Sequence, residues 1–356
     1  MKKALLIALA VAAGIVGKAS AQEKISITPA LVAAAEKEGE VTVQYSNPLD
    51  AMQAEVHDFT KAYPKIRVNL ERKAGSTGVQ SLLQELAAGV NRIDVFQGTD
   101  TGGNQALIDQ NAFAAVAPAN ASELDKSARA MAPYLYYPDK NVSVVMYNPK
   151  FVSDEQAAKL RSWKGILDPA FKGKISLVEP SFGVTLAPLL YVVNTPGLGE
   201  GFLKQLKAQK PVIYLNTAQA RDALISGQQP ISWGAQWESV TLSYVNQGAP
   251  VHFVYTDPTV EWGGNGWGVL AKAPHPNAAR LFFAWGMSNA GGLSLQGPKI
   301  NMRSELTTLA DTRSTIKKLS GQPWFRQPKN IWSPDLQDWI KNGPKYQQLW
   351  TKVMKQ

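Results

Sequence analysis

The chain has 356 residues, of which 45% are hydrophobic and 18% charged, and its formal charge is +9. This composition can bury a core and excludes wholesale disorder, and the length fits two domains or one large domain. The absence of cysteine excludes disulfides, thiolate metal sites, iron–sulfur clusters, a cysteine nucleophile and a lipid-modified N-terminal cysteine.

The first 21 residues have the pattern of a cleaved secretory signal. Lys2 and Lys3 precede an apolar run over residues 4–16, and Ala19 and Ala21 frame a small-x-small cleavage site before Gln22. The alternative is a membrane anchor, but thirteen residues rise only about 20 Å as a helix, short of a hydrocarbon core of about 30 Å. The remaining basic residues are dispersed, which does not favour nucleic-acid binding and favours weak attraction of anionic small molecules.

Short apolar runs alternate with amphipathic stretches through the N-terminal half. Strands are predicted at 41–45, 66–70 and 93–96, and helices at 50–63 and 79–87. Repeated strand–helix–strand units of this kind predict an α/β fold with a mainly parallel sheet and helices on both faces.

A second set of such units follows. Strands are predicted at 174–178, 212–214 and 231–233, and helices at 186–193, 217–226, 236–246 and 278–285. Two sets predict two lobes, which the extended segment 142–147 would join, with a return near 267–270.

We expect a signal peptide at 1–21, a first lobe at 22–142 plus about 266–304, and a second lobe at 148–262. A C-terminal helical segment at 305–356, interrupted by prolines, would pack on the lobes. Val145, Tyr147 and Gly266 are the expected hinge residues.

Loops after the predicted strands hold the candidate ligand contacts, because ligands of α/β folds sit at the carboxyl ends of strands. Small hydroxyl residues and glycines there expose backbone N–H groups that favour a carboxylate, phosphate or sulfate. Each loop also has a purely structural interpretation, as a turn or a capping box. The candidates are Ser46, Asn47, Ser76, Thr77, Gly78, Thr99, Asp100, Ser181, Phe182 and Thr185.

Tryptophan supplies a second group of candidates. Trp237 and Trp262, near predicted element ends, are expected to stack on a ligand, whereas Trp233 and Trp267 are expected in the core. The neighbouring Gln236 and Asn265 complete the candidate set.

Nothing in the sequence marks a catalytic centre. No nucleophile elbow, P-loop or zinc-protease motif occurs, and the three histidines have no partner at ligand spacing. We therefore expect no enzymatic activity, no catalytic residue, no cofactor and no metal site.

Several motifs, in this order, resemble the type II periplasmic solute-binding proteins of ABC importers. Residues 59–68 fit the pattern F-x-K-x-Y-P-x-I-x-V, 75–78 and 86–95 fit G-S-x-G…AG…DV, 163–175 fit an element ending in DP-x-FKGKI, and 273–279 read APHPNAA. The likeness extends to about Gln296. It implies a two-lobed fold with hinge crossover strands and a small anionic or polyhydroxylated solute bound between the lobes. It further implies a monomer in the periplasm and transient contact with an inner-membrane ABC permease. From the absence of cysteine we expect no lipid anchor, and from the dispersed charge no nucleic-acid partner.

The same group includes ferric-iron-binding receptors, so iron or an iron chelate is one alternative, and a secreted hydrolase that reuses the fold is another. In the iron-binding members a histidine, a glutamate and a tyrosine pair hold the metal. The corresponding stretches here begin at Ser46, Gly98 and Gly234 and contain none of these ligands. An organic solute therefore fits the sequence better than ferric iron.

Overall fold

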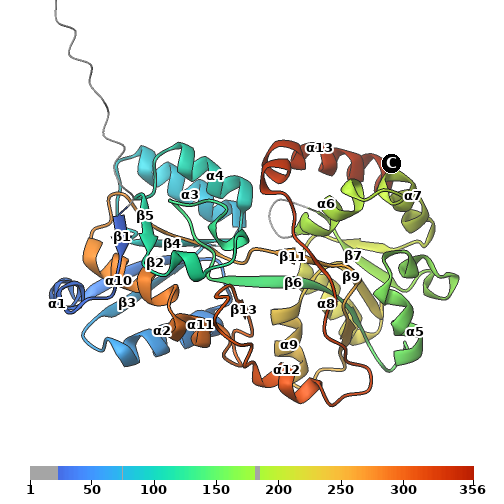
Figure 1. The fold of residues 1–356 in the computed structure, drawn as a ribbon. Helices are drawn as coiled ribbons and strands as arrows, with labels where there is room; N and C mark the ends of the chain where they lie inside the picture. The colour runs from blue at the N-terminus through green and yellow to red at the C-terminus, as the bar shows by residue number, and fades with distance from the viewer. Residues whose placement is uncertain (1–22, 74, 181–184) are drawn as a thin grey trace, which may run out of the picture.

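Two lobes lie side by side in the computed structural model, which describes residues 23–73, 75–180 and 185–356 (Figure 1). Each lobe has a sheet flanked by helices and its own buried hydrophobic core. The prediction of a two-lobed α/β fold is therefore confirmed. None of the helices in these ranges is long and apolar enough to cross a membrane.

The first lobe is built on a four-stranded sheet in the order β12-β4-β2-β3, in which β2, β3 and β4 are parallel and β12 is antiparallel to β4. Val41 and Val43 of β2 are fully buried, and Val43 pairs with Val95 of β4. A small parallel pair, β1 with β5, lies beside this sheet. The strands are β1 (Glu23–Ile25), β2 (Glu40–Tyr45), β3 (Arg67–Arg72), β4 (Val95–Gly98), β5 (Val116–Pro118) and β12 (Gly266–Val269).

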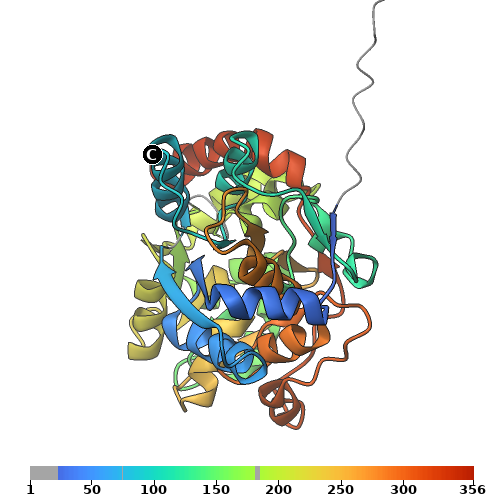
Figure 2. The same cartoon turned by 90° about the vertical axis from the view of Figure 1, so that its left-hand side faces the viewer.

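Helices cover this sheet because their apolar faces supply the core. Phe59 of α2 meets Phe282 and Trp285 of α10 edge-on, and Phe282 stacks on Trp267 of β12. α1 and the edge strand β3 lie on the side turned away from the second lobe (Figures 1 and 2). The helices are α1 (Pro29–Glu38), α2 (Leu49–Ala62), α3 (Gly75–Ala87), α4 (Thr101–Asp109), η1 (Ala121–Glu123), η2 (Ser127–Arg129), α10 (Pro276–Gly286) and α11 (Asn289–Leu295).

The second lobe has a mixed sheet in the order β14-β11-β6-β9-β7-β8, and β10 and β13 also pair with β6. Its strands are β6 (Asp139–Tyr147), β7 (Ile175–Val178), β8 (Val212–Tyr214), β9 (Ile231–Trp237), β10 (His252–Val254), β11 (Thr259–Trp262), β13 (Arg303–Ser304) and β14 (Ile331–Trp332). Its helices are α5 (Asp154–Ala158), η3 (Lys159–Arg161), η4 (Trp163–Leu167), η5 (Pro169–Phe171), α6 (Ala187–Asn194), α7 (Gly199–Ala208), α8 (Thr217–Ser226), α9 (Glu238–Asn246), α12 (Ser314–Leu319) and α13 (Leu336–Met354).

After α11 the chain returns to the second-lobe sheet at β13. Its two earlier passages between the lobes are at the start of β6 and between β11 and β12. The carboxylate of Asp139 joins these two crossings, because it accepts hydrogen bonds from the backbone N–H of Asn265 (3.2 Å) and from its side-chain Nδ2 (3.3 Å). Burial raises the pKa of Asp139 to about 7, against the opposing effect of the Asn265 hydrogen bonds. Gly264 has φ +67°, and a Cβ there would lie 2.2 Å from the Asp139 carbonyl oxygen.

The expected hinge positions need correction. Val145 and Tyr147 lie within the second sheet, where they pair with Val254 and Ile231. Gly266 opens β12 in the first sheet, immediately after the return crossing. The apolar run at 142–147 is a strand with neighbours on both sides, and this burial accounts for its composition as well as a crossover would.

The bounds of three further elements differ from those predicted from the sequence. Residues 267–270 lie in the first lobe, mostly in β12, rather than in the return crossing. β9 continues to Trp237, because Gln236 and Trp237 pair with β6, so α9 begins at Glu238. α13 continues through Pro344.

The side chains of α13 pack on the hydrophobic cores of both lobes, and this burial explains why Pro344 does not end the helix. Leu336 and Ile340 pack against the first-lobe core, whereas Trp339 and Trp350 belong to the second-lobe core.

Candidate functional site

A cavity of about 360 Å³ lies between the lobes. Its volume is within the range of about 300–1,000 Å³ that is typical of small-molecule sites. Both lobes contribute to its lining: Asn47, Pro48, Asp50, Ala51, Thr99, Lys299, Ile300 and Met302 from the side of the first lobe, Asn141 from β6, and Arg221, Trp237, Ser239, Val240, Ser243, Tyr244, Gln247 and Trp262 from the second.

The first-lobe wall is formed where β2 and β4 end. Asn47 follows β2, and its carbonyl oxygen accepts a hydrogen bond from Arg72 Nε (3.0 Å), which fixes the loop. Pro48, the N-cap of α2, lines the cavity, so the N-terminus of this helix and its partial positive charge adjoin the cavity. This helix end has no side-chain capping bond. Asp50, in the first turn, is exposed and adds a negative charge on the same side.

Arg221 of α8 and Tyr244 of α9 form part of the opposite wall. The guanidinium carbon of Arg221 lies 5.3 Å from the centre of the Tyr244 ring, a cation–π geometry. Arg221 Nη1 also donates to Gln236 Oε1 (3.3 Å). These two contacts hold the guanidinium at the wall of the cavity.

Two tryptophans form the apolar part of this wall. The rings of Trp237, at the end of β9, and Trp262, at the end of β11, have centroids 5.8 Å apart and planes inclined by 52°. Both side chains are buried, and Ile300 and Met302 also line the cavity. This pair offers flat apolar surface to a ligand.

A buried ion-pair network holds α9, which lines the cavity, in place. Glu238 contacts Arg303 Nη2 (2.7 Å) and Arg313 Nη1 (2.6 Å), and Tyr255 donates its hydroxyl to the same carboxylate. Burial alone would raise the pKa of Glu238, but the two arginines outweigh it and lower the pKa to about 2. The network therefore fixes the first turn of α9 to the segment that follows α11.

Four of the expected ligand residues line the cavity: Asn47, Thr99, Trp237 and Trp262. Gln236 lies one contact away and orients Arg221. Their predicted contact with a solute stays a prediction.

The remaining candidates in the first lobe have structural partners or lie outside the lining. Ser46 precedes Asn47 and is half-buried. Ser76, Thr77 and Gly78 form the first turn of α3, and the carbonyl oxygen of Gly78 accepts from Gln44 Nε2 (3.1 Å).

Asp100 and Asn265 also have other partners. Asp100 caps α4 by accepting from the backbone N–H of Gly103 (3.3 Å), and Asn265 bonds to Asp139 at the crossing. Ser181 and Phe182 lie outside the described residues.

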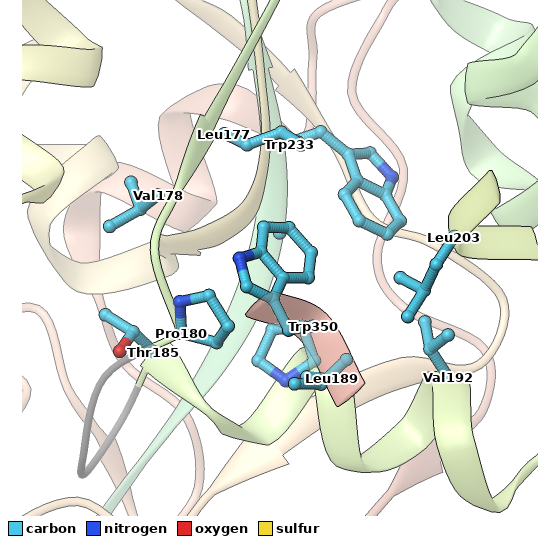
Figure 3. Close-up of a pocket in the computed structure, with 11 residues that line it drawn as sticks. Leu177, Val178, Pro180, Thr185, Leu189, Val192, Leu203, Trp233 and Trp350 are labelled. Atoms are coloured by element: carbon cyan, nitrogen blue, oxygen red, sulfur yellow. The ribbon is translucent and has the colours of Figure 1, made fainter. Parts of the chain in front are cut away.

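Thr185 lines a second, smaller cavity within the second lobe (Figure 3). Trp350 of α13 reaches into its centre, between Pro180, Leu189 and Trp233 (Figure 3). The free volume is about 20 Å³, room for one water molecule and no solute.

Sequence reasoning missed the charged and polar helical residues of the cavity. Arg221 and Tyr244 lie inside predicted helices, where a polar residue usually indicates a solvent-exposed face. Lys299 lies in a loop whose neighbours gave no ligand signal. The only available clue was that both helices follow second-lobe strands, whose ends converge on the cleft.

A metal centre finds little support in the donor set. Within residues 23–73, 75–180 and 185–356, no three histidine, cysteine, aspartate or glutamate side chains are grouped to hold a metal ion. The cavity lining in this part of the chain includes one carboxylate, Asp50.

Comparison with known proteins places this cleft in context. Residues 18–292 match the family described as bacterial extracellular solute-binding protein. No curated protein sequence matches the chain.

Solved structures share the fold at low identity. The substrate-binding protein of an ABC transporter from Agrobacterium tumefaciens has a TM-score of 0.73 and 15% identity, and the match covers 88% of this chain and 94% of that one. Iron-bound HitA from Pseudomonas aeruginosa gives 0.70 and 17%, over 88% and 99%. AfuA from Actinobacillus pleuropneumoniae, with fructose-6-phosphate bound, gives 0.68 and 15%, over 89% and 99%.

Proposed function

The chain belongs to the bacterial extracellular solute-binding proteins, and we propose that it captures a small anionic or polyhydroxylated organic solute between its lobes and delivers it to an inner-membrane ABC permease. The observation that carries this proposal is the cavity of about 360 Å³ with walls from both lobes. After removal of the leader, the protein would act in the periplasm as a monomer, without a lipid anchor, cofactor or nucleic-acid partner.

Closure of the lobes is the proposed mechanism. A solute that touches Asn47 and Thr99 on one side and Arg221 and Trp237 on the other makes its full set of contacts only when the lobes are together. Binding therefore shifts the equilibrium toward the closed form, which the permease would recognise. The captured molecule leaves unchanged.

Ferric iron and hydrolysis fit the cavity less well. Hard cations such as ferric iron need several oxygen anions, and the described lining offers one carboxylate, Asp50, and one tyrosine, Tyr244, instead of a tyrosine pair. A hydrolase needs a nucleophile next to a base, and the described lining contains no histidine. Capture and release of an organic molecule is the better interpretation.

The proposal is tested on the mature protein purified from periplasm. Mass spectrometry of the denatured protein identifies the bound solute, and calorimetry then measures its affinity for the wild type, for Trp237→Ala and for the control Trp332→Ala. Trp332 is half-buried in β14 and is not part of the cavity lining. We expect at least tenfold weaker binding by Trp237→Ala and unchanged binding by the control. Equal affinities of all three proteins would reject the placement of the site.

A further inference from the structure

We propose that the solute is an organic monoanion with a flat apolar skeleton, of which an aromatic carboxylate is the simplest example. This inference rests on the proposed function and selects one of the two solute types named there. It is carried by the position of an oriented guanidinium, that of Arg221, on the same wall as the paired rings of Trp237 and Trp262.

Arg221 is prepared for an anion. Its described contacts are the hydrogen bond from Nη1 to Gln236 and the cation–π contact with Tyr244, and it forms no ion pair within the described ranges. Nη2 makes no hydrogen bond with those residues, and the half-buried side chain lines the cavity. A planar guanidinium held in one orientation matches the two oxygens of a carboxylate, whose binding would supply its missing partner.

The surface beside this cation is mainly apolar. Trp237 and Trp262 form a corner at 52°, and Val240, Ile300 and Met302 also face the cavity. A planar ring that lies against one tryptophan is inclined by about 52° to the other, so it can contact both aromatic surfaces. The wall thus suits the carbon skeleton of an aromatic anion.

Polar groups deeper in the lining are already paired with one another. Asn141 Nδ2 donates to Ser239 Oγ (2.5 Å), and Asn141 Oδ1 accepts from the backbone N–H of Ser239 (3.2 Å). Ser243 Oγ donates to the carbonyl oxygen of Ser239 (3.3 Å). These side chains use part of their hydrogen-bonding capacity on one another, so any hydroxyl group of a polyhydroxylated ligand that finds no partner against this wall costs free energy. An apolar skeleton carries no such cost.

The charges around the cavity favour a single negative charge. Arg221 and Lys299 are positive and Asp50 is negative, so the lining carries one net positive charge. Lys299 and Asp50 are exposed, so water screens them more than it screens the half-buried Arg221. A monoanion would be balanced here, whereas a phosphate dianion or a tricarboxylate would bring excess charge close to Asp50.

Isothermal titration calorimetry with chosen probes tests the inference. The probes are benzoate and phenylacetate, the neutral analogue benzamide, and fructose 6-phosphate as a polyhydroxylated anion. The proteins are the wild type, Arg221→Gln, Arg221→Lys and the control Arg129→Gln, which alters an exposed arginine outside the cavity. Circular dichroism confirms folding of each variant, and the ratio of carboxylate to amide affinity is compared within each protein.

The inference predicts that an aromatic carboxylate binds at least tenfold tighter than benzamide and than fructose 6-phosphate. Arg221→Gln should reduce the carboxylate-to-amide ratio at least tenfold, Arg221→Lys should reduce it less, and the control should retain it. Preference for fructose 6-phosphate, equal binding of benzoate and benzamide, or no binding of either carboxylate would overturn the inference. These results would leave the proposed function intact if Trp237→Ala still weakens binding of the co-purified solute; loss of that effect would reject the placement of the site, and absence of any co-purified or bindable solute would reject the proposed function itself.

Discussion

The substitution Glu55→Gln is expected to stabilise the protein above about pH 5. Glu55 of α2 is 1% exposed, and its Oε1 accepts a hydrogen bond from Gln97 Nε2 (2.9 Å). Burial raises the pKa of Glu55 to about 8, only partly opposed by Gln97, and nearby Asp139 and Asp58 raise it further. Gln97 Oε1 has no partner among the described residues, so a protonated Glu55 can donate to it.

The direction of the pH dependence of stability follows from the proton that Glu55 takes up when the chain folds. Between pH 4.5 and 8 the unfolded chain carries an ionised Glu55 while the folded chain keeps it protonated, so the free energy of unfolding falls as the pH rises. The loss is about 1.4 kcal/mol per pH unit and reaches about 3 kcal/mol at pH 7, two and a half units above the ordinary pKa. A neutral glutamine avoids this loss and can donate to the same Gln97 oxygen.

Denaturant unfolding followed by tryptophan fluorescence at pH 5, 6, 7 and 8 measures the effect. The stability of Glu55→Gln should exceed that of the wild type by an amount that grows from less than about 1 kcal/mol at pH 5 to about 3 kcal/mol at pH 7. The control Glu155→Gln removes an exposed carboxylate and should leave the pH dependence unchanged. A difference that is constant with pH, or a variant less stable than the wild type at pH 8, would refute the reasoning.

Three other substitutions test the packing that frames the cleft. Arg313→Met removes one partner of buried Glu238 and should lower the free energy of unfolding by about 3–5 kcal/mol; an unchanged denaturation midpoint would contradict this. Gly264→Ala places a Cβ 2.2 Å from the Asp139 carbonyl oxygen and should lower the calorimetric melting temperature, which a neutral effect would disprove. Trp350→Ala should leave a cavity in the second-lobe core and lower the free energy of unfolding by about 3–5 kcal/mol in a denaturant unfolding assay. A loss below about 1 kcal/mol would argue against that packing.

Much of the fold could be predicted because its periodicity is strong and local. Val41 and Val43 alternate with polar residues in β2, and Asn216 and Gly227 frame α8 at its predicted bounds. Asn47 and Thr99 could be proposed together because neighbouring parallel strands end at one edge of a sheet.

The hinge and half of the cavity could not be predicted in this way. An apolar run such as 142–147 has the same composition whether it crosses between lobes or lies within a sheet, and pairing of Tyr147 with Ile231 decides between the two. Arg221 and Tyr244 act together only because α8 and α9 meet in space. Contacts between helices of this kind leave no periodic signal in the sequence.

Closure of the lobes around a solute is the central claim, and the distance between the lobes tests it most directly. The chain has no cysteine, so Lys61→Cys on α2 and Lys207→Cys on α7 give two exposed labelling sites, one in each lobe. Single-molecule energy transfer between dyes at these sites should show two populations that exchange, with the co-purified solute enriching one of them in proportion to its binding isotherm. Saturable binding that leaves the distance distribution unchanged would contradict the account.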